Sequence, residues 1–529
     1  MKRKQKWSAL KVVLTIITAA MIVLAFIFYF TLHGQGILPL DDAAYLIIGI
    51  AGITALSMLA FKKSWAAIVM IIVTGFTSCV LAYGINFSDQ VGKLLGNISS
   101  SQTVNVSTMQ VAVLKESSIQ KIEDLTGETL AFSSSTDSQQ IEKLKSDIDS
   151  KVVGLSYNQK SGLSGLANSL LEGEVSAIIM NSEFPSMISE MEGYEDFEDR
   201  IRIIYSVDVR TITEKTPEEL SNVDVFTLYL SGIDTFGDVM QTSRSDVNVI
   251  AVVNIKTKHV LLINTPRDYY VPLPNSAGVR DKLTHAGIYG VENSMGTLEM
   301  LYDTKINYYL RMNFSGFEKI IDTIGGIDVE SEEDFTSTLN PQYTYEKGTN
   351  HLNGEAALFF ARERKAFLEG DNQRGRDHMA IIEATIKKMT TSPEILTNYQ
   401  AVFEILKDSF QTSMPEDLIK KLISTQISDS TEWKIDSYAV EGEGERRRTF
   451  SEPNSYLYVA MPEYYTVQNA KDMINQVKEE TTCTEPTTTA GKDNSYYEDD
   501  YDFVEDDEDD ENDEDDDEGY YSNRGYNYN

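Results

Sequence analysis

The chain has 529 residues and a formal net charge of -36, from 82 acidic and 46 basic side chains. A hydrophobic share of 42% is ordinary for a folded protein, and the length suits two or three domains. No basic stripe of the kind that binds nucleic acid is present, so we expect no nucleic-acid partner. The two cysteines, Cys79 and Cys483, lie far apart in the sequence, which argues against a fold that rests on disulfides.

Three uncharged apolar runs open the chain: Val12–Leu32, Ala43–Phe61 and Trp65–Ile85. Each has about the 20 residues that an α-helix needs to cross a bilayer, a length that disfavours buried helices of a soluble core. Basic residues precede the first run and separate the second from the third. Because positive flanks stay inside the cell, the sequence predicts a multi-pass membrane anchor over residues 1–85 with a cytoplasmic N-terminus. The rest of the chain is then extracellular.

The next segment, residues 86–107, is rich in Ser, Asn and Gly and indicates a linker. Strands at Val111–Leu114, Leu130–Phe132 and Ile178–Met180 alternate with helical segments. This alternation predicts a small α/β accessory domain over residues 104–210. We find no catalytic set in it, and the sequence leaves open whether it is a spacer, a wall contact or a ligand-binding unit.

A second α/β domain is expected over residues 223–480. Its apolar, β-branched runs predict strands, and its amphipathic runs predict helices. The expected strands are Val225–Leu230, Val247–Ile255 and Val260–Thr265, and the expected helices include 374–390, 394–410 and 416–426. The tail, residues 481–529, has 17 acidic side chains between positions 498 and 518, and this composition predicts disorder.

Polar side chains stand where the expected strands of the second domain begin and end. They are Asp234, Arg244, Asp246, Arg267 and Asp268. Ligand sites in α/β sheets gather on such loops at the strand ends. These residues are therefore candidates for a binding or catalytic site.

A further basic segment is the stretch FARERKAFLEGDNQRGRDHM, residues 360–379, which holds four arginines in an otherwise acidic chain. Arginine presents a planar fork that matches phosphate oxygens, although a single arginine is often an ordinary salt bridge. Arg362 and Arg364 would diverge on a helix, so they converge on a ligand only if the helix ends between them. We expect Lys365 and Arg376 to face solvent.

The carboxylates Asp234 and Asp246 are candidate ligands of a hard cation such as Mg²⁺, which takes one or two carboxylates together with substrate phosphates. Two aspartates alone are weak evidence, and their value comes from standing beside the arginines. A pyrophosphate group needs both kinds of help, since the metal neutralises one side and the arginine forks hold the other.

The ordered motifs LSGIDTFG, SRSDVNVIAVVN, VLLINTPRDYYV and DKLTHAGIYG, followed by the arginine-rich stretch, resemble the LytR-CpsA-Psr family of cell-wall assembly proteins over residues 223–480. The three apolar runs and the accessory domain resemble the capsule-biosynthesis branch of that family. The resemblance implies an α/β/α catalytic domain with a central mixed sheet. It also implies a phosphotransferase that moves a glycopolymer, with its phosphate, from an undecaprenyl-pyrophosphate carrier to peptidoglycan.

Carried over by motif, the resemblance assigns roles to individual residues. Asp234 and Asp246 would bind Mg²⁺, with Mn²⁺ as a substitute. The residues expected to grip the pyrophosphate are Arg244, Arg267, Arg362, Arg364 and Arg374, and those expected to contact substrate are Asp268, Lys282, Asp371 and Asn372. His378 stands where the family often has Gln, and its charge would depend on pH near the ordinary histidine pKa of ~6.5.

The residues leave two other functions open: a hydrolase of polyprenyl-pyrophosphate substrates, and a non-catalytic membrane sensor or scaffold. A serine, cysteine or zinc enzyme has no support in the spacing of the His and Cys residues. The expected partners are the lipid bilayer, the lipid-linked glycan and peptidoglycan, and the apolar core would hold the lipid tail. The sequence does not show which polymer is transferred or whether Asp246 or Asp268 is the general base. It also leaves open whether capsule or wall-polymer export machinery is a further partner.

Overall fold

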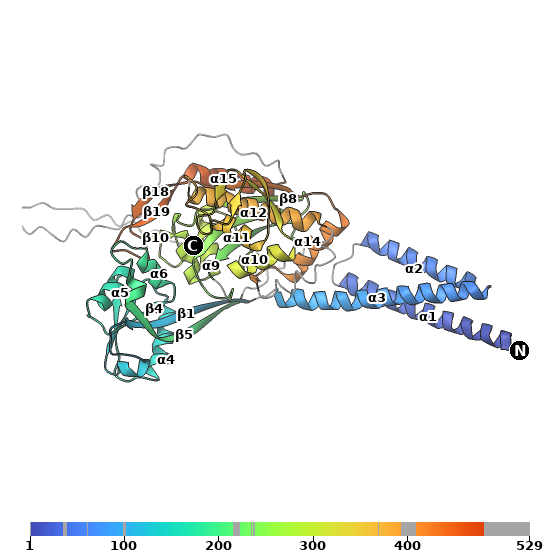
Figure 1. Cartoon of the computed structure of the whole chain (residues 1–529), viewed down its shortest axis with the longest axis horizontal. Helices are drawn as coiled ribbons and strands as arrows, with labels where there is room; N and C mark the ends of the chain where they lie inside the picture. The colour runs from blue at the N-terminus through green and yellow to red at the C-terminus, as the bar shows by residue number, and fades with distance from the viewer. Residues whose placement is uncertain are drawn as a thin grey trace, which may run out of the picture.

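The computed structural model describes residues 2–34, 40–60, 62–98, 102–214, 223–233, 235, 238–368, 370–392 and 409–480. They form three parts that follow one another along the chain: a bundle of long helices, a unit built on a five-stranded sheet, and a unit built on a six-stranded sheet (Figure 1). Both sheets are mixed, so the protein is a mixed α/β protein. The tail predicted for residues 481–529 lies outside the described residues.

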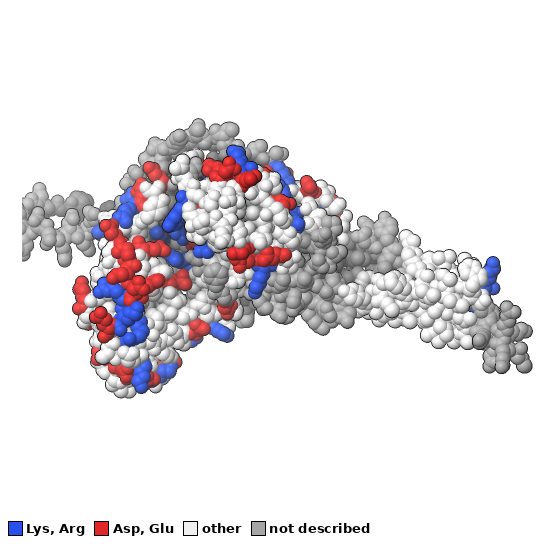
Figure 2. Space-filling view, viewed as in Figure 1, with Lys and Arg blue, Asp and Glu red and all other residues white. Residues whose placement is uncertain are grey.

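The N-terminal helices are α1 (Lys2–Gly34), α2 (Leu40–Ala60) and α3 (Ser64–Ile98). They pack on one another through a buried cluster of Leu14, Ala60 and Ala67. The described part of the bundle has an almost uncharged surface, whereas the charged side chains gather over the two α/β units (Figure 2). Such a surface suits a hydrocarbon environment better than water.

Two stretches of this bundle, Ala9–Thr31 and Ser64–Ile85, are long and apolar enough to cross a membrane. The second helix contributes a shorter apolar stretch, Ile47–Ala60. The lengths therefore support the first and third of the three predicted spans. The second span and the orientation in the membrane stay predictions.

The accessory unit has the strand order β3-β2-β4-β1-β5, in which β2 runs parallel to its two neighbours and β1 runs antiparallel to β4 and β5. Its strands are β1 (Gln102–Leu114), β2 (Thr129–Ser133), β3 (Ser156–Lys160), β4 (Ala177–Asn181) and β5 (Ile201–Glu214). Its helices are η1 (Ile122–Leu125), α4 (Ser138–Asp149), α5 (Gly162–Leu171), α6 (Phe184–Ser189) and α7 (Phe197–Arg200).

The linker predicted for residues 86–107 is wrong where the structure describes it. Helix α3 continues to Ile98, and β1 already begins at Gln102. The polar residues of this segment alternate with Val104 and Val106, and the strand pairs with β5 along its whole length. A polar composition therefore concealed a paired strand.

The third part has the strand order β16-β11-β6-β7-β8-β17. Strand β11 is parallel to β6 and β17 is parallel to β8, while β16–β11, β6–β7 and β7–β8 are antiparallel. These strands are β6 (Val225–Ile233), β7 (Ser245–Asn254), β8 (His259–Asn264), β11 (Tyr308–Met312), β16 (Phe410–Thr412) and β17 (Lys434–Ala439).

Helices cover both faces of this sheet. Strand β7 alternates, so Ile250 and Val252 pack with helices α9 (Val291–Tyr302) and α15 (Tyr464–Lys478), whereas Val249 and Ala251 face α12 (Asp371–Thr391) and α14 (Glu416–Ser428). A third buried cluster joins α10 (Phe314–Thr323) and α11 (Gly354–Arg362).

The remaining elements are β9 (Tyr270–Pro272), β10 (Arg280–Lys282), α8 (Leu283–Ala286), η2 (Gly287–Tyr289), β12 (Ile327–Ser331), β13 (Phe335–Thr336), β14 (Thr344–Tyr345), β15 (Gly348–Leu352), β18 (Gly442–Arg447) and β19 (Leu457–Pro462).

The helix predicted at 394–410 lies almost wholly outside the described residues, and where the chain is described again it forms the edge strand β16. The helices predicted at 374–390 and 416–426 correspond to α12 and α14. Asn353 caps the start of α11, since its side chain accepts a hydrogen bond from the amide of Ala356 at 2.9 Å.

Candidate active site

The candidate residues meet at one edge of the six-stranded sheet. Antiparallel pairing places the end of β6, the start of β7 and the end of β8 at this edge, since Ile233 pairs with Ser245 and Val249 pairs with Asn264. Asp246 is the second residue of β7 and Arg267 follows β8. The sheet therefore joins residues that the sequence separates by about twenty positions.

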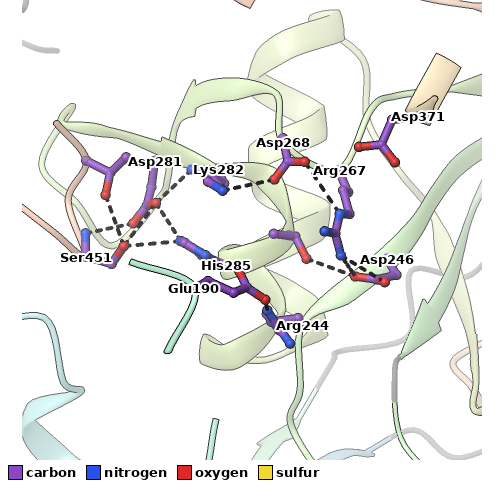
Figure 3. Close-up of polar contacts among 12 residues, drawn as sticks. Glu190, Arg244, Asp246, Arg267, Asp268, Asp281, Lys282, His285, Asp371 and Ser451 are labelled. Atoms are coloured by element: carbon purple, nitrogen blue, oxygen red, sulfur yellow. Dashed lines mark hydrogen bonds and ion pairs between the residues drawn. The ribbon is translucent and has the colours of Figure 1, made fainter. Parts of the chain in front are cut away.

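A chain of ion pairs links four of these residues (Figure 3). The Nη1 atom of Arg267 lies 3.0 and 3.1 Å from the two carboxylate oxygens of Asp246. Its Nε atom lies 3.5 Å from Asp268, which in turn lies 3.2 Å from Nζ of Lys282. Thr284 donates a hydrogen bond to Asp246 at 3.5 Å. All four charged side chains are less than a fifth exposed.

Both carboxylates are held in the ionised state. Burial alone would raise the pKa of Asp246, but Arg267, Arg374 and Arg244 lower it below its ordinary value. Burial opposes the same shift at Asp268, where Lys282 and Arg267 lower the pKa. The site thus keeps two negative oxygen ligands next to several fixed cations.

The arginine-rich loop begins where α11 ends. Arg362 is the last residue of the helix, and Glu363 has extended backbone angles of φ -67° and ψ 137°. The chain therefore leaves the helix between Arg362 and Arg364, and both side chains line one cavity. The sequence analysis required the helix to end between these two arginines if they were to share a ligand, and the structure meets that condition.

Glu363 organises this loop, a role that the sequence analysis missed. Its buried carboxylate accepts hydrogen bonds from the amides of Thr338, Arg364 and Ala366 and from the hydroxyl of Thr338, at 2.6–3.0 Å. Burial would raise the pKa of Glu363, but these donors lower it. The sequence did hold a signal of this role, because Glu363 is an acidic residue between two arginines of a basic motif.

Helix α12 supplies the remaining arginine. Asp371 in its first turn lies 3.0 Å from Nη2 of Arg374 and 3.8 Å from Nη1 of Arg364. Gly375, which follows Arg374, lets helix α12 pack closely against the end of β8. A Cβ atom at this position would lie 2.2 Å from the Asn264 side chain. This contact sets Arg374 beside the sheet edge. Asn372 shares the first turn and is half-buried.

Five of the candidate residues lie at the mouth of a 720 Å³ cavity: Asp246, Arg267, Arg362, Arg364 and Arg374. Its charged lining consists of Asp246, Arg267, Arg362, Glu363, Arg364, Lys365 and Arg374. Its interior runs between one face of the sheet and helices α10, α12 and α14, and is lined by apolar side chains such as Leu228, Ala251, Ile320, Ile386 and Leu422. The cavity can accommodate a molecule with an anionic head and a hydrocarbon tail. Lys365, expected in solvent, is exposed and also borders the mouth.

His378 lines the same cavity and differs from the sequence expectation. Its Nε2–H donates to the carbonyl oxygen of Ala361 at 2.8 Å, which anchors α12 to α11. Burial and the nearby Arg374 lower the pKa of His378 to about 3. The expectation of a charge that changes near pH 6.5 is wrong, because the imidazole is neutral throughout the physiological range.

Comparison with known proteins identifies this arrangement. The model of the LytR_cpsA_psr family matches residues 203–474, just over half of the chain. The chain belongs to this family. The match begins in the last strand of the accessory sheet and covers the whole six-stranded sheet with its arginine-rich loop.

Relatives of this family cover part of the chain. A protein of Enterococcus faecalis named polyisoprenyl-teichoic acid–peptidoglycan teichoic acid transferase TagU is 31% identical over 212 residues, which are 40% of this chain and 68% of that protein. A protein of the same name from Bacillus cereus is 33% identical over 201 residues, 38% of this chain and 64% of the relative. The chain thus spans about two thirds of the length of these relatives.

Two solved structures are similar to this chain over about half of its length. Bacillus subtilis TagV is 26% identical with a TM-score of 0.41 and covers 49% of this chain and 98% of its own. A structure described as TagT bound to LI-WTA has 25% identity and a TM-score of 0.39, over 50% of this chain and 94% of that one.

A second family model, described as a DNA polymerase processivity factor, matches residues 62–180. That match starts before α3 and stops inside β4, so it cuts through the five-stranded sheet and corresponds to no folded unit.

Several of the residues expected at the family site do not line the cavity: Asp268, Lys282, Asp371 and Asn372 are absent from its described lining, although Asp268 and Asp371 pair with arginines that line it. The described lining does not include Arg244, whose Nη1 instead lies 2.6 Å from Glu190 of the accessory unit (Figure 3). Asp234 lies outside the described residues, so its metal role stays a prediction. Among the described residues, no group of three or more His, Cys, Asp or Glu is arranged to hold a metal ion.

A serine, a histidine and an aspartate also meet near this site, but not as a catalytic triad (Figure 3). Asp281 and Ser451 both contact the same nitrogen of His285, Nδ1, at 2.7 and 3.2 Å. A triad needs the serine and the carboxylate on opposite nitrogens of the ring. All three side chains are buried, so the cluster joins the β10–α8 corner to the 449–452 turn.

Proposed function

We propose that this chain is a membrane-anchored phosphotransferase that moves a glycopolymer, together with its phosphate, from a polyprenyl-pyrophosphate carrier to peptidoglycan. The observation that carries the proposal is the 720 Å³ cavity with an apolar interior and an arginine-rich mouth. The names of the relatives, which mention a polyisoprenyl-linked polymer and peptidoglycan, support the same substrate classes.

The apolar interior suits the prenyl chain of the carrier. Burial of hydrocarbon contributes about 0.8 kcal/mol for each CH₂ group, so several isoprene units would supply much of the binding energy. This energy is independent of the sugar, which would let one cavity accept different polymers on the same carrier. The capsule branch is part of the proposal only through the sequence resemblance.

The mouth suits the pyrophosphate. Arg362 at the end of α11, Arg364 in the loop that follows and Arg374 in the first turn of α12 converge on it, and Asp371 pairs with the latter two. Arginine remains charged at any physiological pH and can donate two parallel hydrogen bonds to phosphate. Charge that builds on the departing phosphate would be stabilised most, which is the condition for catalysis rather than binding alone.

Asp246 is the described residue that fits a magnesium ion, because its carboxylate is ionised, faces the cavity and stands beside the phosphate-binding arginines. When bound, Mg²⁺ or Mn²⁺ would neutralise pyrophosphate charge. Titration of Mn²⁺ by electron paramagnetic resonance, with lipid pyrophosphate present, tests this assignment without turnover. Asp246→Asn should weaken Mn²⁺ binding at least tenfold, and unchanged binding would contradict the assignment.

In the proposed reaction, a hydroxyl oxygen of peptidoglycan attacks the phosphorus that bears the glycan. A new phosphorus–oxygen bond forms, the bond to the bridging oxygen breaks, and polyprenyl phosphate leaves with that oxygen and takes up the proton that the hydroxyl loses. Asp246 and Asp268 both have lowered pKa values, and a lowered pKa makes a weak base. We therefore assign these carboxylates to the positioning of Arg267 and Lys282.

The helix bundle would keep the site within reach of its lipid. As the sequence predicts, α2 would cross the bilayer together with the two longer stretches, and three crossings from a cytoplasmic N-terminus would put the α/β units outside the cell, where peptidoglycan lies. The carrier lipid would then enter the cavity from the outer leaflet.

A transfer assay tests the proposal. Full-length protein in detergent is given a polyprenyl-pyrophosphate-linked saccharide and a peptidoglycan oligomer, and the products are identified by mass spectrometry. We expect a saccharide–phosphate–peptidoglycan adduct that disappears in Arg362→Ala. Free saccharide phosphate alone would indicate the hydrolase, and binding without turnover would indicate a scaffold; either result would overturn the proposal.

A further inference from the structure

A second cavity, of 310 Å³, lies between the accessory unit and the six-stranded-sheet unit. Its lining comes from β1, α4 and β5 on one side and from the segment before β7, Pro274, η2 and α9 on the other. The lining residues are Asn105, Ser107, Asp137, Gln139, Gln140, Thr211, Thr213, Thr242, Pro274, Tyr289, Glu292 and Asn293. Ten of these twelve side chains carry an amide, a hydroxyl or a carboxylate and are not aromatic.

The floor of this cavity is buried and pre-organised. Asn105, Ser107, Gln140 and Thr242 are each less than a tenth exposed. The Oγ atom of Ser107 lies 2.9 Å from that of Thr242 and accepts a hydrogen bond from Nε2 of Gln140 at 3.0 Å. The backbone amide of Thr242 also donates to Val106 at 2.7 Å, which fixes the two units to each other at this point.

One polar atom of the floor has no partner. Oε2 of Glu292 accepts a hydrogen bond from Asn105 at 2.8 Å, whereas the buried Oε1 accepts none. Burying a carboxylate oxygen without a donor is unfavourable, so the position calls for a hydrogen-bond donor. Gly290 makes the arrangement possible, because its φ of +108° and missing Cβ let Asn105 approach to a distance that a side chain would forbid.

We infer that this cavity binds a neutral saccharide unit. Hydroxyl groups of a sugar can donate to Glu292 and exchange hydrogen bonds with the amides and hydroxyls of the floor, while Tyr289 and Pro274 supply apolar surface for a ring. The described lining has two carboxylates and no Lys, Arg or His, so it offers no cation of its own to phosphate or another anion. The volume is at the lower end of the ~300–1,000 Å³ range of small-molecule sites, which suits one or two sugar rings.

The inference deepens the proposed function and rests on it only for the source of the sugar, which is either the peptidoglycan acceptor or the transferred polymer. Thr242 stands two residues before Arg244 and four before Asp246, so the cavity is joined by a short segment to the catalytic edge of the sheet. A glycan held here would be positioned relative to the reacting phosphate.

Ligand-observed NMR on the full-length protein in detergent tests the inference. Diacetylchitobiose represents an N-acetylhexosamine glycan, maltose represents a neutral hexose polymer, and glucose 1-phosphate is the anionic probe. We expect millimolar or tighter binding of one neutral disaccharide and much weaker binding of the phosphate. Preference for diacetylchitobiose would support the acceptor as the source, and preference for maltose would support the polymer.

Three variants locate the binding. Glu292→Gln keeps the size of the side chain and should weaken disaccharide binding about tenfold or more. Gln139→Ala changes an exposed side chain of the rim, leaves the fold unchanged and should weaken binding a fewfold. Gln159→Ala, on the exposed strand β3 of the same unit, is the matched control and should bind normally.

Failure of the inference and failure of the proposed function can be told apart. Arg362→Ala should abolish transfer and leave disaccharide binding intact, because the two cavities are separate. Three results would overturn the inference, whatever the transfer assay shows. They are failure of both disaccharides to bind, binding of glucose 1-phosphate equal to that of the disaccharides, and unchanged disaccharide binding in both Glu292→Gln and Gln139→Ala.

Discussion

The two cavities of this protein differ in almost every physical property. The one at the sheet edge has an apolar interior and a cationic mouth, and the one between the units has a polar floor with carboxylates and no cation among its described lining. An amphipathic anion suits the first cavity, whereas a neutral sugar suits the mostly polar lining of the second. The difference indicates that one chain can separate recognition of a lipid-linked phosphate from recognition of a glycan.

Arg244 and Glu190 form an ion pair where the catalytic unit meets the accessory unit. Arg244 has an exposed fraction of 12%, and its pairing with Glu190 ties the catalytic edge to the accessory unit. The same accessory segment reaches the β18–β19 hairpin, where Glu192 lies 3.3 Å from Arg446. The accessory unit thus contacts the catalytic unit near the site as well as at the polar cavity.

The largest effect is expected at the cationic mouth. Arg364→Ala should lower the transfer rate on the order of 10²–10³-fold, because one donor to a developing phosphate charge is lost. The side chain is 41% exposed, so the melting temperature should stay within about 2 °C of the wild type. Arg376→Ala is the matched control, since Arg376 pairs with Glu332 away from the described lining. Equal losses in both variants would show that the mouth has no special role.

The next effect is expected inside the apolar cavity. Leu228→Trp enlarges a side chain that lines the interior and should exclude part of a long prenyl chain. We expect affinity for a long-chain polyprenyl pyrophosphate to fall about tenfold while affinity for geranyl pyrophosphate stays unchanged, as measured by calorimetry. If both affinities fall equally, the tail does not occupy this space.

A pH-dependent effect is expected at His378, whose pKa is lowered to about 3 from an ordinary value near 6.5. Below pH 6.5 the unfolded chain binds a proton at this position and the folded chain does not, so stability is lost as pH falls towards 3. His378→Gln removes this loss and can still donate to Ala361. Between pH 7 and 4.5 its free energy of unfolding should decrease by up to about 3 kcal/mol less than that of the wild type. Identical pH profiles of melting would contradict the assigned pKa.

The smallest effect is expected at the boundary. Glu190→Gln weakens the ion pair of Arg244 and leaves that guanidinium more available to an anionic ligand, so KM for the lipid substrate should decrease about two- to fivefold. The matched control is Glu192→Gln, which changes the neighbouring acid and its pair with Arg446. Steady-state kinetics of the transfer reaction measure both. An increase of KM in Glu190→Gln would mean that the pair organises the site instead of restraining it.

Much of the catalytic unit could be predicted because its signals are local. The strands around Val249 and Leu261 are apolar β-branched runs, the Asn353 cap marks the start of α11, and the divergence of Arg362 and Arg364 on a helix required the helix to end. The family motifs then fixed the order of these elements. Local patterns therefore predicted which residues approach the mouth.

The rest depends on contacts between distant segments. The environment of His378 arises from α11 and α12 packing together, and no neighbour in sequence signals a pKa near 3. The pairing of Glu190 with Arg244 and the polar cavity both arise where the accessory sheet meets the catalytic unit. The polar start of β1 was mistaken for a linker because Asn105 and Ser107 face this polar junction rather than a hydrophobic core.

A structure of the full-length protein in complex with a polyprenyl pyrophosphate would decide whether the cavity with the cationic mouth holds this ligand. We expect the pyrophosphate within hydrogen-bond distance of Arg362, Arg364 and Arg374, with the prenyl chain between the six-stranded sheet and helices α12 and α14. A prenyl chain bound elsewhere, or a pyrophosphate that makes no contact with these arginines, would contradict it.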